Sequence, residues 1–274
     1  MSNRLKVIGG ITAGVLVLLL LILIPFRSGK VDSLSHRDWA KIKESGRLRV
    51  VTDRSSLGFQ LKDNQVEGFN YEIVKAFADS MGLELEVNIM NDLDSAVYGL
   101  WEYRFDLIAM NIPVTSRMKD NVYFTIPIVT SRQMLIQHSG RNDSAETTLI
   151  SAHRQLKDIE ITIPKNSPHK LRLENLSDEI AEPLKTRELP GVTTQELVKA
   201  VSEGKVPYTI CDELQARKLQ NEYPNFDFSM PVGFNQHYAW AMSKKSMGLH
   251  DVLNKFLKDF LTTNAYWDIY RKYY

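Results

Sequence analysis

Hydrophobic and polar positions after residue 46 switch repeatedly between the periodicity of a helix and that of a strand. From Tyr71 to Met81, apolar residues recur at spacings of three and four, which predicts a helix that ends at Gly82. Residues 83–89 then alternate between apolar and polar side chains, as in a strand with one buried face. Further strands are predicted at 48–52, 105–110, 159–163, 208–211 and 237–242, and further helices at 94–103, 213–222, 248–261 and 264–273. This alternation predicts an α/β fold with mostly parallel sheets, in which ligands bind beyond the carboxyl ends of the strands.

Capping residues mark three more helix starts. Residues 35–38 (Ser-His-Arg-Asp) and 193–196 (Thr-Thr-Gln-Glu) resemble capping boxes, which predicts helices that run to Gly46 and Gly204. Residues 167–168 (Ser-Pro) combine a capping residue with a proline at the first helical position, which predicts another helix start.

A long apolar run precedes this pattern at the N-terminus. Val7–Phe26 contains no charged residue, and as a helix it would reach roughly 30 Å, the thickness of a bilayer core. Residues 25–30 (Pro-Phe-Arg-Ser-Gly-Lys) contain no small-residue cleavage site, and no cysteine near the run could carry a lipid. We therefore predict that residues 1–30 are an uncleaved transmembrane anchor, with a removed signal peptide as the alternative.

The charges around this run leave its orientation open. Arg4 and Lys6 precede it, whereas five basic residues follow between positions 27 and 43. The excess of positive charge after the run would keep the large domain in the cytoplasm, but long domains cross membranes despite such charges.

Composition excludes several classes of protein. The 274 residues hold 34 Lys and Arg against 33 Asp and Glu, and residues 31–274 alone hold 30 against 33. This balance argues against a nucleic-acid partner, which needs a concentrated basic surface. The single cysteine, Cys211, excludes an internal disulfide or a multi-cysteine metal site. No phosphate-binding glycine loop and no catalytic motif of a zinc protease or serine hydrolase occurs, so we expect no cofactor and no catalysis.

Several segments, taken in their order along the chain, resemble a known family. They are Gly46–Asp53, Gly68–Ile73, Phe105–Ala109, Thr115–Arg117, Tyr123–Ile128, Ser202–Thr209 with Asp212-Glu213, and Ala265–Tyr270. Together they resemble the extracellular solute-binding protein family 3, the periplasmic receptors of ABC importers for polar amino acids, over about residues 40–274. They also resemble the non-catalytic domain of membrane-bound lytic transglycosylases, which belongs to that family. Since the sequence ends with this domain, we expect no transglycosylase domain to follow.

The resemblance implies a two-lobed, type II periplasmic-binding-protein-like fold behind the N-terminal transmembrane helix. One lobe would comprise residues 31–129 and 238–274, the other residues 130–237, with crossings near 128–133 and 238–240. A small zwitterionic ligand would bind in the cleft, and the lobes would close on it by a hinge motion. The resemblance also implies a single-pass protein of the inner membrane with its domain on the periplasmic side, and ABC-transporter membrane subunits as partners.

Two charged residues match ligand-binding positions of the family. Arg117 matches the arginine that grips a ligand carboxylate, and a guanidinium suits this role because it makes paired, charge-assisted bonds. Asp212 matches the acid that pairs with the ligand ammonium, and it follows an apolar strand. The alternatives are a solvated loop arginine for Arg117 and a helix cap for Asp212.

Four uncharged residues complete the implied site. Ser167 matches a hydroxyl that meets the same carboxylate, with a purely capping role as the alternative. Asn111 stands where the family often has a serine facing the ligand. Phe59 and Tyr71 are candidate aromatic residues of the cleft, although a role in the core is the stronger expectation for each.

Departures from the family pattern widen the choice of ligand. Pro113 stands where amino-acid receptors usually have a small hydroxyl residue, and Tyr103 stands where the family commonly has glycine. A modified amino acid or a cell-wall peptide is therefore a candidate ligand beside a standard amino acid. Three functions follow: a receptor for ABC-type uptake or sensing, a regulatory module that senses peptidoglycan fragments for a membrane enzyme, and a dehydratase-like enzyme with Glu213 as its acid.

Overall fold

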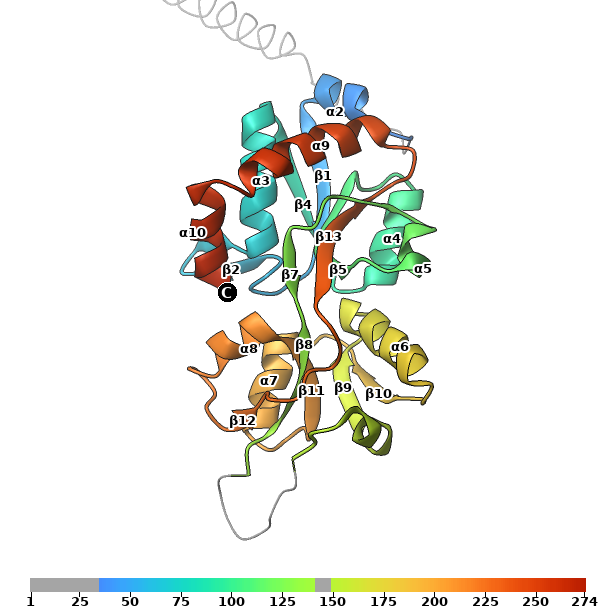
Figure 1. Ribbon diagram of the computed structural model, residues 1–274. Coiled ribbons are helices and arrows are strands. Elements are labelled where there is room, and N and C mark those ends of the chain that lie inside the picture. Colours follow the sequence, from blue (N-terminus) through green and yellow to red (C-terminus); the bar gives the residue numbers. More distant parts are fainter. Residues whose placement is uncertain (1–34, 141–148) are drawn as a thin grey trace, which may run out of the picture. The chain divides into compact units, whose positions relative to one another are not determined.

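The computed structural model describes residues 35–140 and 149–274, which form two α/β lobes joined by two crossings of the chain (Figure 1). The predicted membrane anchor at residues 1–30 lies outside the described residues. Within the described ranges, no helix combines the length and the apolar character needed to cross a bilayer.

Lobe one is built on a sheet with the strand order β4-β1-β5-β13-β6, in which β7 also pairs with β13. Its strands are β1 (Arg47–Thr52), β4 (Glu84–Ile89), β5 (Leu107–Pro113), β6 (Tyr123–Phe124), β7 (Val129–Ser131) and β13 (Gln236–Met242). The strands β4, β1 and β5 are parallel, as the sequence predicts, but β13 runs antiparallel to β5, β6 and β7. The sheet is mixed because β13 enters it on the way back from the other lobe.

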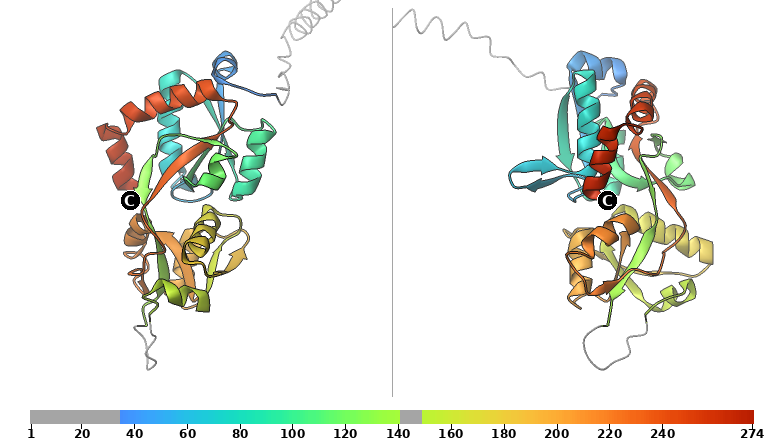
Figure 2. Two further views of the ribbon diagram at one scale, coloured as in Figure 1. Left: turned by 45° about the vertical axis from the view of Figure 1, so that its right-hand side comes forward. Right: turned by 60° about the vertical axis from the view of Figure 1, so that its left-hand side comes forward.

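Alternate residues of this sheet face two separate helical layers. Val50 faces helices α2 (Trp39–Ser45), α3 (Phe69–Met81), α9 (Met247–Phe260) and α10 (Asn264–Tyr273), whose apolar sides form one core with it. Its neighbour Val51 packs with α4 (Leu93–Trp101) and α5 (Ser116–Lys119) in a second core on the opposite face. A short hairpin of β2 (Gln60–Lys62) and β3 (Gln65–Glu67), which the pattern does not predict, extends from this lobe (Figure 2).

Lobe two contains two smaller pairings of strands. The strand β8 (Gln133–His138) lies between β11 (Tyr208–Asp212) and β12 (Phe226–Asp227), antiparallel to both, while β9 (Glu160–Pro164) and β10 (Lys185–Leu189) are parallel. Helices α6 (Pro168–Ile180), α7 (Thr194–Ser202) and α8 (Glu213–Leu219) and a 3-10 helix at His153–Asp158 surround these strands. Their apolar residues form two further cores that belong to this lobe.

The chain passes between the lobes at two places. It leaves the first sheet where β7 ends at Ser131, and it enters the second where β8 begins at Gln133. It returns through residues 233–235, between Val232, which packs in a core of lobe two, and the start of β13. The lobe boundaries assigned from the sequence stay a prediction.

Helix caps agree with the sequence at some ends and differ at others. Thr193 and Glu196 form the predicted capping box of α7. The predicted cap at residue 35 is wrong, because α2 begins at Trp39 and Asp38 caps it. The Asp38 carboxylate also accepts hydrogen bonds from the backbone of Gly248 and Leu249 at the start of α9. One aspartate thus serves two helix N-termini, which local spacing does not reveal.

Candidate ligand-binding site

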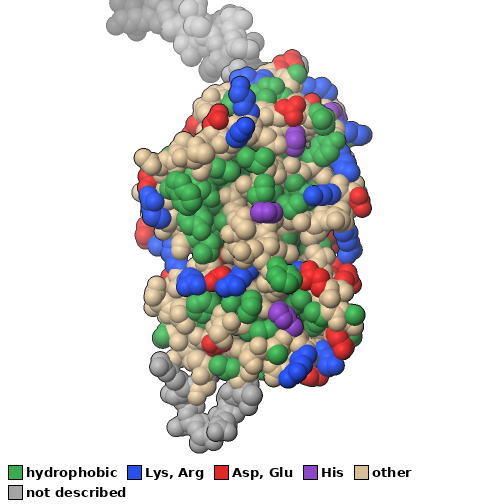
Figure 3. Space-filling view, viewed as in Figure 1, with side chains coloured by type: hydrophobic (Ala, Val, Ile, Leu, Met, Phe, Trp, Pro, Cys, Tyr) green, Lys and Arg blue, Asp and Glu red, His purple; other side chains and the backbone are tan. Residues whose placement is uncertain are grey.

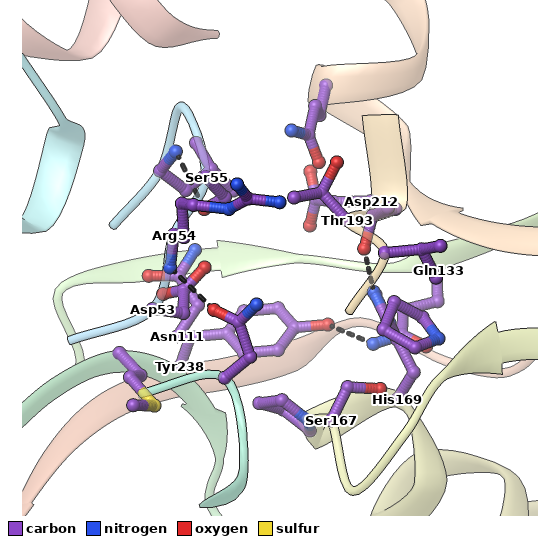
Figure 4. A pocket seen from close by; sticks show the side chains of 18 residues that line it. Asp53, Arg54, Ser55, Asn111, Gln133, Ser167, His169, Thr193, Asp212 and Tyr238 are labelled. Carbon is purple, nitrogen blue, oxygen red and sulfur yellow. Dashed lines mark hydrogen bonds between the residues drawn. The ribbon is translucent and has the colours of Figure 1, made fainter. Parts of the chain in front are cut away.

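A cavity lies between the two lobes and is lined by residues from both (Figure 4). The space between its walls measures about 750 Å³, which includes open solvent at its mouth. The polar lining residues are Asp53, Arg54, Ser55, Asn91 and Asn111 from lobe one, Gln133, Ser167, His169, Thr193, Thr194, Asp212 and Gln215 from lobe two, and Tyr238 from β13. Several of them follow the carboxyl ends of strands, where the sequence predicts a ligand to bind.

Contacts between the lobes hold the walls of this cavity together. The Asn166 carbonyl accepts from the Leu93 backbone N–H at 2.9 Å, and the Asn166 side-chain amide donates to the Asp92 carboxylate at 2.6 Å. The side-chain amide of Gln215 donates to the Ser56 hydroxyl at 3.2 Å. On the face in Figure 3, side chains of both charges lie along the boundary between the lobes. The structure therefore has the lobes in contact around the cavity.

Asp212 supplies a buried carboxylate to the cavity. It ends β11, it is 6% exposed, and it accepts a hydrogen bond from the Leu214 backbone N–H at 3.0 Å as the cap of α8. The two roles considered for this residue therefore coexist. Burial raises its pKa to about 6, because the charged form loses solvation.

Asp53 supplies a second carboxyl group from the opposite lobe. It follows β1, and burial raises its pKa, although a hydrogen bond from Ser55 acts in the other direction. Gly58 lies against it so closely that a Cβ there would be 2.4 Å from the Asp53 Oδ1 atom. Glycine thus lets the loop after β1 fold back over this acid.

Arg54 is the cation of the cavity that the sequence does not single out. Its backbone N–H donates to Asn91 Oδ1 at 2.7 Å, which holds the loop, and its guanidinium reaches to 3.4 Å from the Gly191 carbonyl of lobe two. In Figure 4 its side chain extends toward the side where Thr193 and Asp212 lie. Among the lining residues of the described ranges, Arg54 is the only lysine or arginine. Its place two residues after the strand at 48–52 is the sequence signal that could have identified it.

Polar atoms of lobe two complete the lining. The hydroxyl of Ser167 is buried and has no hydrogen-bond partner among the described residues, so it does not cap α6. His169 lies 2.8 Å through Nε2 from the Thr194 hydroxyl, and burial lowers its pKa to about 4, so its imidazole is neutral at pH 7. The Gln133 side-chain amide donates to the Tyr238 hydroxyl at 3.3 Å, which leaves its carbonyl oxygen unpaired among the described residues.

With this geometry in place, comparison with known proteins identifies the family. The sequence model of the bacterial extracellular solute-binding proteins, family 3, matches residues 48–274. The chain belongs to this family.

Proteins similar to this family 3 chain include curated relatives in sequence and solved structures with a similar fold. Membrane-bound lytic murein transglycosylase F of Desulfosudis oleivorans is 27% identical over 235 residues, which are 85% of this chain and 50% of the relative. The chain thus spans about half the length of the curated relatives it matches. The solute receptor for L-cysteine of Neisseria gonorrhoeae superposes with a TM-score of 0.70 at 20% identity, over 85% of this chain and 92% of the receptor. An ancestral arginine-binding protein bound to arginine gives a TM-score of 0.68 at 21% identity, over 84% of this chain and 98% of that protein. These structures share the two-lobed fold.

The structure brings three of the six predicted site residues of this family 3 domain to the cavity. Asp212, Ser167 and Asn111 line it. Phe59 and Tyr71 do not; their rings pack edge to face with centroids 5.3 Å apart, both are half-buried, and neither is among the residues of the hydrophobic cores. Their role in the cleft stays a prediction.

Arg117 also lies outside the cavity lining. It belongs to the short helix α5, its side chain is 73% exposed, and its Nη1 atom is 2.8 Å from Glu174 Oε2 on α6. The carboxylate of Glu174 gives the guanidinium a partner on the other lobe, outside the cavity. The role of Arg117 toward a ligand stays a prediction.

Glu213 is not placed to act as the acid of a dehydratase-like reaction. Its carboxylate accepts from Arg132 and from Arg217 at 2.6 Å each, these contacts lower its pKa, and it does not line the cavity. Within the described ranges, no group of three or more His, Cys, Asp or Glu side chains is arranged to hold a metal ion.

Proposed function

We propose that this family 3 domain binds a small zwitterion between its lobes, with Arg54 holding the ligand carboxylate and Asp212 an ammonium group. The observation that carries the proposal is that a guanidinium from one lobe and a buried carboxylate from the other line the same cavity. A ligand with both charges would contact both lobes at once and stabilise the closed arrangement. The buried hydroxyl of Ser167 would add a hydrogen bond to it.

The balance of charges favours a ligand with an additional cationic group. The cavity holds two carboxyl groups, Asp53 and Asp212, against one guanidinium, Arg54, while the His169 imidazole is neutral at pH 7. Burial raises the pKa of both carboxyl groups. A second ammonium or guanidinium group on the ligand would lower both pKa values and gain charge-assisted hydrogen bonds. Cationic amino acids and peptides with a diamino acid carry this set of charges.

We place the domain on the extracytoplasmic side of the membrane, tethered through residues 1–30, where it would pass its ligand to an ABC transporter or report it to a partner. The extracellular family and the membrane-bound enzymes among the relatives support this location. A second candidate function is a module that senses peptidoglycan fragments for a membrane enzyme. The name shared by the curated relatives, a murein transglycosylase, favours this candidate.

Two measurements on the full chain test the proposal. Native mass spectrometry of freshly purified protein should detect a co-purified small molecule with at least one carboxylate and one amine. Thermal-shift screening should find that L-arginine, L-lysine or a muropeptide with a diamino acid raises Tm, whereas L-leucine and L-glutamate raise it less. At a ligand concentration of 100 Kd, binding stabilises the folded state by about 2.7 kcal/mol, or roughly 5–10 °C.

Paired variants make the screen specific to the cavity. Asp212→Asn should abolish the shift, because it removes the carboxylate that meets the ammonium group. Asp63→Asn is the matched control, since Asp63 is exposed in the turn of the β2–β3 hairpin. If no amino acid or muropeptide changes Tm of the wild-type chain, the proposed function is wrong.

A further inference from the structure

The last residue of the chain reaches the wall of the cavity. The side-chain amide of Asn111, which lines the cavity from β5, donates a hydrogen bond of 2.6 Å to the hydroxyl of Tyr274. Asn111 is 163 positions away in sequence, so only the folded lobe brings the two together. Tyr274 follows α10 and itself is not among the lining residues.

The Tyr274 ring is held in place on several sides. Its centroid is 4.9 Å from that of Phe69 and 5.1 Å from that of Tyr270, and its backbone N–H donates to the Tyr270 carbonyl at 2.9 Å. The helix before it is fixed as well, since the Tyr266 hydroxyl donates to the Ile128 carbonyl at 2.7 Å. The hydroxyl of Tyr274 is therefore a fixed hydrogen-bonding group.

Electrostatics also connects Tyr274 to the cavity. Burial raises the pKa of its phenol well above the usual value, and the nearby Asp212 carboxylate raises it further. The phenol is therefore neutral at physiological pH, and it can accept from Asn111 without placing a charge next to the acid.

We propose that Tyr274 is a positioning residue of the ligand site, which fixes the side chain of Asn111 before the ligand enters. A free amide samples several rotamers, and ordering them on binding reduces affinity. Tethering one side of the amide restricts these rotamers and leaves its remaining polar atoms for the ligand. The inference rests on the proposed function, because it assigns Tyr274 to the cavity proposed to hold the zwitterion.

The affinity test uses the full chain in detergent with L-arginine as the probe in isothermal titration calorimetry. Tyr274→Phe keeps the ring and removes the hydroxyl, so it should weaken binding by about 3- to 10-fold at nearly unchanged Tm. Tyr270→Phe is the matched control, since it removes a hydroxyl from the neighbouring ring, in α10, and should leave affinity unchanged. In an Asn111→Ala background, Tyr274→Phe should have no further effect. Equal losses in both backgrounds would overturn the inference.

A ligand-free readout separates this inference from the proposed function. In protein labelled with ¹⁵N at asparagine, the side-chain amide signal of Asn111 is identified by its loss in Asn111→Ala. Tyr274→Phe should move this signal, and Tyr270→Phe should move it little. An unmoved signal overturns the inference whatever the protein binds. If the signal moves but the protein binds neither L-arginine nor any other ligand of the thermal screen, the proposed function is wrong. Tyr274 then has no positioning role toward a ligand.

Discussion

Arg117 of lobe one and Glu174 of lobe two form an ion pair across the lobe boundary, with 2.8 Å between Nη1 and Oε2. Both side chains are substantially exposed, so the pair contributes about 0–1 kcal/mol to the contact between the lobes. Arg54 lies closer to the proposed ligand, because it lines the cavity and reaches toward Gly191 of the other lobe. Two arginines of lobe one thus meet the other lobe; Arg54, which is exposed, lines the cavity, and Arg117 does not.

The first prediction separates the roles of these two arginines. Arg54→Ala should weaken binding of a zwitterionic ligand by about 10- to 100-fold, because it removes charge-assisted hydrogen bonds worth about 1.5–3 kcal/mol. Arg117→Ala should weaken it by about fivefold or less, through loss of the exposed ion pair. Isothermal titration calorimetry of the ligand against both variants measures the difference. A larger loss for Arg117→Ala would instead support the carboxylate grip that the sequence assigns to Arg117.

The second prediction concerns the ion pair as a contact between lobes. Arg117→Glu places two carboxylates opposite each other and should favour the open form, so ligand affinity falls by roughly two- to fivefold. The swap Arg117→Glu with Glu174→Arg should restore most of the affinity, because it restores opposite charges. Small-angle X-ray scattering of the ligand-free proteins should give a larger radius of gyration for Arg117→Glu than for the wild type or the swap variant. If the swap variant binds the ligand as weakly as Arg117→Glu alone, Arg117 affects affinity by a route other than this ion pair.

Sequence reasoning succeeds where local chemistry decides the structure. The capping box at Thr193 forms as predicted, since its partners lie within one turn. Asp212 lies at the cavity because the end of an apolar strand already places it there. In each case, residues close in sequence determine the local structure.

The same reasoning fails where distant parts of the chain decide. Arg54 reaches the cavity because Gly58 lets its loop fold over Asp53 and because Asn91, 37 residues away, holds its backbone. Arg117 matches the family motif, but its orientation depends on Glu174 in the other lobe. Neither relationship leaves a periodic pattern in the sequence.

The third prediction addresses the N-terminal segment, which lies outside the described residues. The chain should stay in the membrane fraction after a carbonate wash, because Val7–Phe26 is apolar over a bilayer thickness and no cleavage site follows it. Replacing Leu19 and Leu20 by arginine should release part of the protein, since charges at the middle of a bilayer are costly. Soluble mature protein that begins after residue 26 would contradict the anchor and support the cleaved signal.

The fourth prediction uses the raised pKa of Asp212 and expects opposite pH trends for stability and binding. The folded-state pKa of about 6 lies above the unfolded value near 3.8, so the folded state binds the proton more tightly. Stability without ligand should therefore fall as pH rises from about 4 to 6, by at most about 3 kcal/mol from this group. Binding of an ammonium group needs the ionised carboxylate, so affinity should rise as pH passes through about 6.

Comparison with Asp212→Asn isolates this carboxyl group from other acids, including Asp53 in the same cavity. Urea unfolding of the ligand-free protein between pH 4 and 8 should give a wild-type stability that declines relative to the variant as pH rises. Calorimetric titration with L-arginine over the same range should give a wild-type affinity that increases with pH, whereas the variant should bind weakly throughout. Parallel pH profiles of wild type and variant in unfolding would mean that Asp212 is not the titrating group. A wild-type affinity independent of pH would mean that its carboxylate does not meet the ligand cation.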